Sequence, residues 1–117
     1  MKNKKITNRD RLSHILDSIT AIENFIEEYS KTSFLDDKKT INATPFQFAV
    51  IGEAIIHVDE EILDKYEFPW YKVRAFGNFI LHEYHAIEDK VIWDTAKKDL
   101  PLLKEVIEVI LKSEFNA

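Results

Sequence analysis

The sequence predicts an all-α fold: an antiparallel up-and-down four-helix bundle with one short extra helix. Two glycines and three prolines among 117 residues are too few turn formers for an all-β chain. Apolar residues recur at three- and four-residue steps in four long stretches, which is the spacing of amphipathic helices. The links between these stretches are short, and short links favour antiparallel packing of successive helices.

The first helix is expected over residues 8–31. Thr7 and Asp10 have the spacing of a capping box, in which the side chain of each residue accepts a hydrogen bond from the backbone N–H of the other. Apolar side chains then follow the helical period as far as Tyr29. A short turn is expected near Ser33.

The second helix has its clearest start at Thr44-Pro45, with threonine as the N-cap and proline at the first helical position. It is expected to run to about Val58. Alternatively the helix begins several residues earlier and Pro45 lies within it. Gly52 costs about 1 kcal/mol relative to alanine inside a helix, so we expect a close approach of another helix to compensate for it.

The remaining helices follow from their start signals. Pro69 opens the third helix, Asp89 caps a short extra helix, and Asp99-Leu-Pro101 starts the last one. The last helix is expected to bury Leu102, Leu103, Val106, Ile107, Ile110 and Leu111. No strand is needed to account for any stretch of the sequence.

The third helix carries the residues best suited to chemistry. Arg74, Asn78 and His82 are spaced four apart, so they share one face of the helix. The opposite side is expected to offer Val73, Phe76, Ile80 and Leu81 to the core. A histidine, with an ordinary pKa of about 6.5, can take and give a proton at neutral pH, and arginine or asparagine can hold a phosphate oxygen. The alternative is a structural histidine bonded to a neighbouring carboxylate or carbonyl.

Composition bounds the class of protein. The length and the 45% content of hydrophobic residues fit a single domain over residues 1–117, with residues 1–7 as a frayed basic arm. The net charge is −5, but residues 1–11 sum to +4 and the rest to −9, which suits a basic protein partner. The lack of cysteine, of an apolar leader and of long apolar runs predicts a cytoplasmic protein without membrane contact.

Neither a metal nor a cofactor is expected. His82 and His85, with Glu83 and Glu88 nearby, do not repeat the Glu-x-x-His pairs that mark metal sites in helical bundles. The chain also has no glycine-rich loop that could cradle the phosphates of a nucleotide.

Several segments together resemble the HepT-like branch of the HEPN superfamily. That branch reads Pro-Trp, Arg-Asn-x-x-x-His-x-Tyr, Trp and Asp-Leu-Pro, and this chain has Pro69-Trp70, Gly77-Asn78-Phe-Ile-Leu-His82-Glu-Tyr84, Trp93 and Asp99-Leu-Pro101 in the same order. The segments Arg9-Asp10-Arg11-Leu12 and Ile51-Gly52-Glu53-Ala54 also resemble the family, and the similarity runs from about Arg9 to Leu111.

The resemblance implies that the protein is the toxin component of a type VII toxin–antitoxin module. Such a protein is expected to be a metal-independent ribonuclease acting on RNA rather than DNA, with His82, Asn78 and Arg74 as catalytic residues. Its partner would be a small MntA-like nucleotidyltransferase antitoxin, which silences the toxin by AMPylation of the tyrosine in His-x-Tyr, here Tyr84. An adenylyl group beside His82 would block substrate phosphate by its charge and its volume. The alternative for Tyr84 is an aromatic helix end with its hydroxyl in water.

One position departs from the family pattern. Gly77 stands where the motif arginine directly precedes asparagine, and the nearest upstream arginine is Arg74. Roughly 12 Å of helix rise separates Arg74 from His82, and helical side chains lean toward the N-terminus. Arg74 can act on the same phosphate as His82 only if the substrate spans that gap, or if Arg74 or Lys72 approaches from a second subunit. Otherwise the chain is a catalytically impaired subunit that serves as a binding partner of a nucleotidyltransferase.

The chain has aromatic residues at Phe34, Tyr66, Phe68, Trp70, Tyr71 and Trp93. Some of these have no obvious place in a small four-helix core, which favours a homodimer. Trp70 and Phe79 are expected at the apolar centre of the interface, with His82 lining a groove at the two-fold axis. The alternative is that these rings close the ends of the bundle.

Overall fold

The computed structural model describes residues 5–115 and is helical throughout, without any strand in that range. The elements are α1 (Asn8–Ile26), α2 (Lys31–Leu35), α3 (Lys38–Ile56), α4 (Glu60–Leu63), α5 (Trp70–His82), the 3₁₀ turn η1 (Tyr84–Ala86), α6 (Asp89–Lys98) and α7 (Leu100–Phe115). The predicted all-α class is confirmed. The predicted basic arm lies partly outside the described residues.

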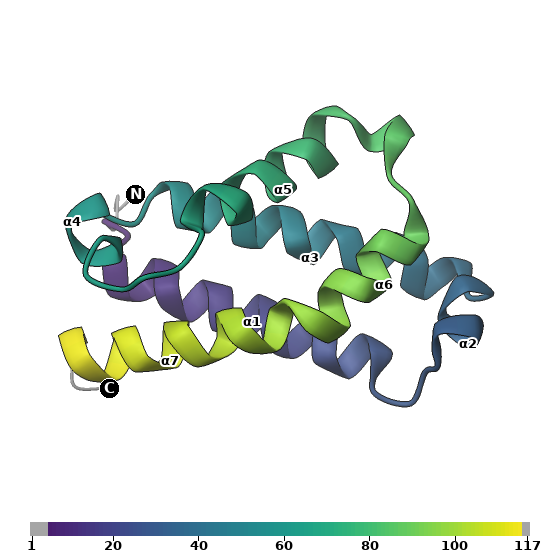
Figure 1. The fold of residues 1–117 in the computed structure, drawn as a ribbon, viewed down its shortest axis with the longest axis horizontal. Helices are drawn as coiled ribbons and strands as arrows, with labels where there is room; N and C mark the ends of the chain where they lie inside the picture. The colour runs from purple at the N-terminus through teal and green to yellow at the C-terminus, as the bar shows by residue number, and fades with distance from the viewer. Residues whose placement is uncertain (1–4, 116–117) are drawn as a thin grey trace.

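The four longest helices alternate in direction, with α1 and α5 running one way and α3 and α7 the other (Figure 1). α3 packs against both α1 and α5, and α7 packs against α1 and α6. α5 and α7 form no comparable contact, so one side of the expected bundle is open. A closed four-helix bundle is therefore not confirmed.

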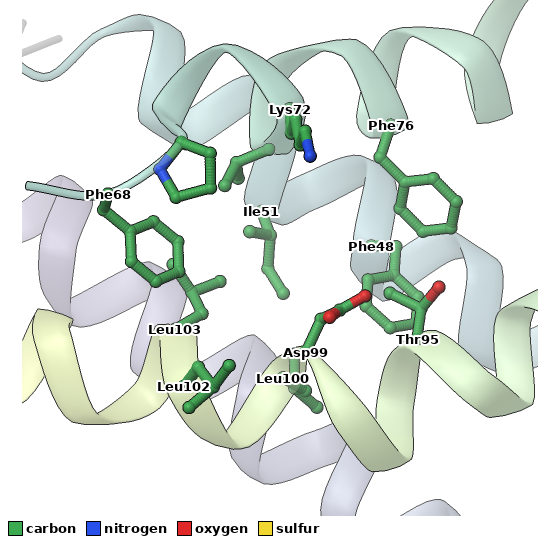
Figure 2. A pocket seen from close by; sticks show the side chains of 12 residues that line it. Phe48, Ile51, Phe68, Lys72, Phe76, Thr95, Asp99, Leu100, Leu102 and Leu103 are labelled. Atoms are coloured by element: carbon green, nitrogen blue, oxygen red, sulfur yellow. The ribbon is translucent and has the colours of Figure 1, made fainter.

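A cavity of about 350 Å³ lies on this open side, between α5 and the junction of α6 with α7 (Figure 2). Its lining is mainly apolar and includes Phe48, Ile51, Phe68, Val73, Phe76 and Leu103. Lys72 and Asp99 lie at opposite sides of it in Figure 2. Leu102, which was expected in the core, lines the cavity and is 58% exposed.

α1 begins as predicted and ends earlier. The Thr7 hydroxyl accepts the N–H of Asp10 and the Asp10 carboxylate accepts the N–H of Thr7, each at 3.0 Å, so the capping box is confirmed. The helix stops at Ile26 because the chain starts a second capping box soon afterwards. There the Ser30 hydroxyl accepts the N–H of Ser33 at 3.1 Å and opens α2.

The helix start predicted at Thr44-Pro45 is wrong, and the alternative of an earlier start holds. The Asp37 carboxylate accepts the N–H groups of Lys39 and Thr40 at 3.0 and 3.3 Å and caps α3. Thr44 lies inside the helix, where its hydroxyl donates to the carbonyl of Thr40 at 2.8 Å, and Pro45 follows it within α3. The Asp37 cap thus satisfies two of the backbone donors at the start of α3.

The Asp37 cap also ties α3 to the end of α1. The Tyr29 hydroxyl donates to the Asp37 carboxylate and accepts from the Thr40 hydroxyl at 3.2 Å. The bond from Tyr29, followed by that from the N–H of Thr40, lowers the pKa of Asp37 below its ordinary value. The carboxylate is thereby kept charged where the first turn of α3 needs an acceptor.

Gly52 and Gly77 face each other where α3 packs on α5, which confirms the close approach predicted at Gly52. A Cβ atom on Gly52 would lie 2.7 Å from the Cα of Gly77, and a Cβ on Gly77 would lie 2.7 Å from the Cα of Gly52. The next contacts are the backbone nitrogen of the opposite glycine, at 3.2 and 3.3 Å, and then the carbonyl oxygens of Val73 and Phe48, at 3.3 and 3.4 Å. Because all these neighbours are backbone atoms, the two glycines set the distance between α3 and α5.

Three of the six aromatic residues singled out in the sequence belong to the core. Trp70 is 6% exposed, and its indole N–H donates to two backbone carbonyls at 3.1 Å each. Phe34 and Trp93 are buried with their ring centroids 5.2 Å apart. The expectation of Trp70 at a dimer interface is therefore wrong, whereas Phe79 and Tyr71 remain 38% and 65% exposed.

Candidate functional site

The candidate catalytic residues lie along α5, which ends at His82. Asn78 and His82 are exposed and Arg74 is half-buried. Because α5 is continuous through all three positions, they share one face with about one turn between neighbours. Within residues 5–115, none of these side chains has a hydrogen-bond or ion-pair partner, so they are available to a ligand rather than engaged in the fold.

The chain turns directly after His82. The N–H of Glu83 donates to a carbonyl of the last turn of α5 at 2.8 Å, and the 3₁₀ turn η1 follows. Tyr84 is 75% exposed there, and its ring meets that of His85 edge to face at 5.8 Å. His85 also lies 3.8 Å from the Glu83 carboxylate. Of the two neighbouring histidines, His82 is the one whose ring has no partner among the described residues.

The position directly before Asn78 cannot hold an arginine in this packing. Any side chain at Gly77 would begin with a Cβ atom 2.7 Å from the backbone of Gly52. The glycine thus has a packing reason, which the sequence alone does not reveal. Arg74 remains the nearest arginine on α5, at roughly 12 Å of rise from His82.

A groove of about 270 Å³ runs beside this face, between α1, α3 and α5. Leu81 was expected in the core, but it is 52% exposed and lines the groove. It follows Asn78 by three positions and Arg74 by seven, so it lies on the same side of α5 as those residues. The other lining residues are Arg11, His14, Phe46, Ala49, Val50, Glu53 and Ala54.

Arg11 and His14 of this groove were not among the residues singled out from the sequence. In the sequence, Arg11 stands out only as one of the charges of residues 1–11 and as part of the segment Arg9-Asp10-Arg11-Leu12. Arg11 directly precedes the buried Leu12, and His14 directly precedes the buried Ile15. Their three-residue spacing was the available signal that both lie on one face of α1, beside its buried face. What they face follows only from the packing of α1 on α3.

No three histidine, cysteine, aspartate or glutamate side chains within residues 5–115 come together in a group that could hold a metal ion. One of the remaining histidines, His57, is paired with Glu53 at 3.0 Å one turn earlier in α3. None of the helices in the same range is long and apolar enough to span a membrane.

Comparison with known proteins places the chain in a family. The family model described as ribonuclease HepT-like matches residues 15–110. A protein of Thermococcus cleftensis named "Probable ribonuclease HepT" is 32% identical over 92% of this chain and 99% of its own length. A relative from Methanocaldococcus jannaschii named "Putative RNase" is 33% identical over 85% of this chain and 84% of its own length. Another with that name, from Caldanaerobacter subterraneus subsp. tengcongensis, is 28% identical over 92% of this chain and 97% of its own length.

No solved structure matches the chain. The matched range contains most of α1, all of α2 to α6 and most of α7, and so includes the whole of α5 with Asn78 and His82. On this evidence the chain belongs to the ribonuclease HepT-like family.

Proposed function

We propose that this protein cleaves RNA without a metal ion, with His82 as its proton-transfer group. The observation that carries the proposal is the exposed, unpartnered His82 one turn beyond an exposed Asn78, in a chain of a ribonuclease-like family. Purified protein incubated with single-stranded RNA in the presence of EDTA tests it. Cleavage supports the proposal, and intact RNA contradicts it.

The chemistry follows from the side chains on this face of α5. His82 takes the proton of a ribose 2′-hydroxyl, and the 2′-oxygen attacks the adjacent phosphorus. The bond from phosphorus to the 5′-oxygen breaks, which leaves a 2′,3′-cyclic phosphate and, after proton transfer from an imidazolium, a 5′-hydroxyl. Asn78 orients the phosphate by donating a hydrogen bond, and Arg74 partly neutralises it.

A homodimer would complete this site. One His82 cannot be both unprotonated base and protonated acid at the same moment, whereas His82 of the partner subunit could protonate the leaving oxygen. A two-fold arrangement would also bring Arg74 or Lys72 of the partner subunit toward the phosphate. Exposed Phe79, Tyr71 and Leu81 on α5 offer apolar area for such a contact. Light scattering that reports a monomer at micromolar concentration would contradict this arrangement.

We further propose that the protein is the toxin of a type VII toxin–antitoxin module, located in the cytoplasm and bound by an MntA-like nucleotidyltransferase. The supporting observations are the family and the acidic balance of residues 12–117, which suits a partner with a basic face. Co-expression with a neighbouring nucleotidyltransferase and a pull-down tests the pairing. A genome without such a neighbour, and purification without a partner, would contradict it.

Tyr84 is the residue on which this partner would act. At 75% exposure on η1, its hydroxyl is open to an enzyme that transfers AMP from ATP to the phenolic oxygen and releases pyrophosphate. We expect the co-expressed protein to gain the mass of one or more adenylyl groups and to lose RNA cleavage. The variant Tyr84→Phe should gain no mass and keep its activity, whereas Tyr71→Phe, at an exposed position on α5, should be modified as in wild type. An unchanged mass gain in Tyr84→Phe would contradict the assignment.

A non-catalytic subunit is the second candidate, and the absence of arginine at position 77 favours it. Substituting Gly77→Arg cannot serve as a repair experiment, because the side chain would clash with Gly52. The two candidates differ in a simpler result. A chain that binds the nucleotidyltransferase while leaving RNA intact at every protein concentration would be the impaired subunit.

A further inference from the structure

The groove beside α5 is lined by the last residue of the basic segment at the start of the chain. Residues 1–11 carry a net charge of +4, while the remaining residues sum to −9. Arg11, the last residue of the basic segment, lines the groove together with His14, one helical turn further along α1. Arg11 therefore gives the groove a fixed positive charge, and His14 adds a ring nitrogen one turn away, so both can contact an anionic ligand.

The opposite end of the groove is aromatic. Phe46 on α3 lines it with 64% of its surface exposed, and its ring packs on no other ring within residues 5–115. Phe46 and Glu53 mark about two turns of α3, roughly 10 Å of groove. Glu53 is the acidic residue of the lining, and its carboxylate is held by His57 at 3.0 Å.

We propose that this groove binds single-stranded RNA, with a base stacked on Phe46 and backbone phosphates held by Arg11 and His14. Cations along a groove with an exposed aromatic ring are the means by which proteins bind single strands without reading their sequence. The proposal rests on the proposed ribonuclease function, because Leu81, which lines the groove, directly precedes His82 in α5. It assigns the substrate strand a path that runs from the site on α5 across α3 to the start of α1.

Binding of a cleavage-resistant RNA tests the path without requiring activity. The probe is a fluorescently labelled, fully 2′-O-methylated single-stranded oligonucleotide, which lacks the attacking hydroxyl. Fluorescence anisotropy at several salt concentrations gives its affinity for the full chain. Arg11→Gln should weaken binding and reduce the slope of log affinity against log salt by about one. Phe46→Ala should weaken binding about fivefold or more without changing that slope.

The chain offers a matched control for Arg11. Arg9 carries the same charge on the same helix and is exposed, but it does not line the groove. If Arg9→Gln weakens binding as much as Arg11→Gln, or if Arg11→Gln and Phe46→Ala bind like wild type, the groove is not the path. A loss of dimer in Phe46→Ala with unchanged RNA affinity would assign the groove to a second copy of the chain and overturn the proposal.

The same experiment separates this proposal from the ribonuclease proposal. Wild-type protein that binds the probe in the groove but leaves unmodified RNA intact would remove the ribonuclease proposal and keep the groove. If wild-type protein cleaves RNA while Arg11→Gln and Phe46→Ala bind the probe like wild type, the groove proposal is removed and the ribonuclease proposal is kept.

Discussion

Replacing His82 by alanine is expected to lower the rate of RNA cleavage by about a hundredfold or more. His82 is the histidine at the end of α5 whose ring has no partner among the described residues, and alanine can neither take nor give a proton. The fold should be unaffected, because the side chain is exposed and forms no hydrogen bond, ion pair or ring contact within residues 5–115. The measurement is the rate constant for cleavage of a single-stranded RNA, for both proteins, in buffer containing EDTA.

His85→Ala is the matched control for this experiment. His85 lies three residues further along the chain and is similarly exposed, but it is engaged with Glu83 and with the ring of Tyr84. We expect His85→Ala to cleave RNA like wild type. Cleavage that survives His82→Ala, or that is lost equally in both variants, would contradict the assignment of His82 as the proton-transfer group.

Substituting Gly77→Ala is expected to destabilise the protein, against the usual preference of helices for alanine. Helix propensity alone would raise the free energy of unfolding by about 1 kcal/mol. The added Cβ atom, however, would lie 2.7 Å from the Cα of Gly52, so α5 would have to move away from α3. Overpacking of this kind typically costs about 1–3 kcal/mol and occasionally more. Urea unfolding of the two proteins gives the sign of the difference.

Ala75→Gly provides the control on the same helix. Ala75 is exposed on α5, so this change should lower the free energy of unfolding by about 1 kcal/mol through propensity alone. Gly52→Ala should destabilise the protein as Gly77→Ala does, because the contact is reciprocal. A Gly77→Ala protein that is more stable than wild type would show that α3 and α5 do not approach as closely as the structure has them.

The helices were predictable where apolar periodicity and a cap agree. α1 has both, and its capping box at Thr7 is confirmed. α3 shows how the signals compete, because the Thr44-Pro45 pattern is a regular helix start and yet lies inside a helix capped by Asp37. Nothing local in the sequence ranks one cap over the other. The choice depends on Tyr29, which reaches Asp37 only once α1 has packed beside α3.

The site was predictable as far as one helix can define it. The four-residue spacing of Arg74, Asn78 and His82 requires only that α5 be continuous. The exposure of Leu81 and the groove it lines depend instead on how α5 sits on α3. The distance between α5 and α3 is set by the contact of Gly52 with Gly77. Each glycine can be noticed in the sequence, but their contact cannot.

The central claim is that this chain cleaves RNA through the ribose 2′-hydroxyl, with no metal ion. The most direct test is to incubate the purified wild-type protein with a defined single-stranded RNA in EDTA and to identify the ends of the products by mass spectrometry. We expect 2′,3′-cyclic phosphate and 5′-hydroxyl ends, with no cleavage where the 2′-oxygen is methylated. Products with 5′-phosphate ends, cleavage of the methylated RNA, or cleavage abolished by EDTA would contradict the claim.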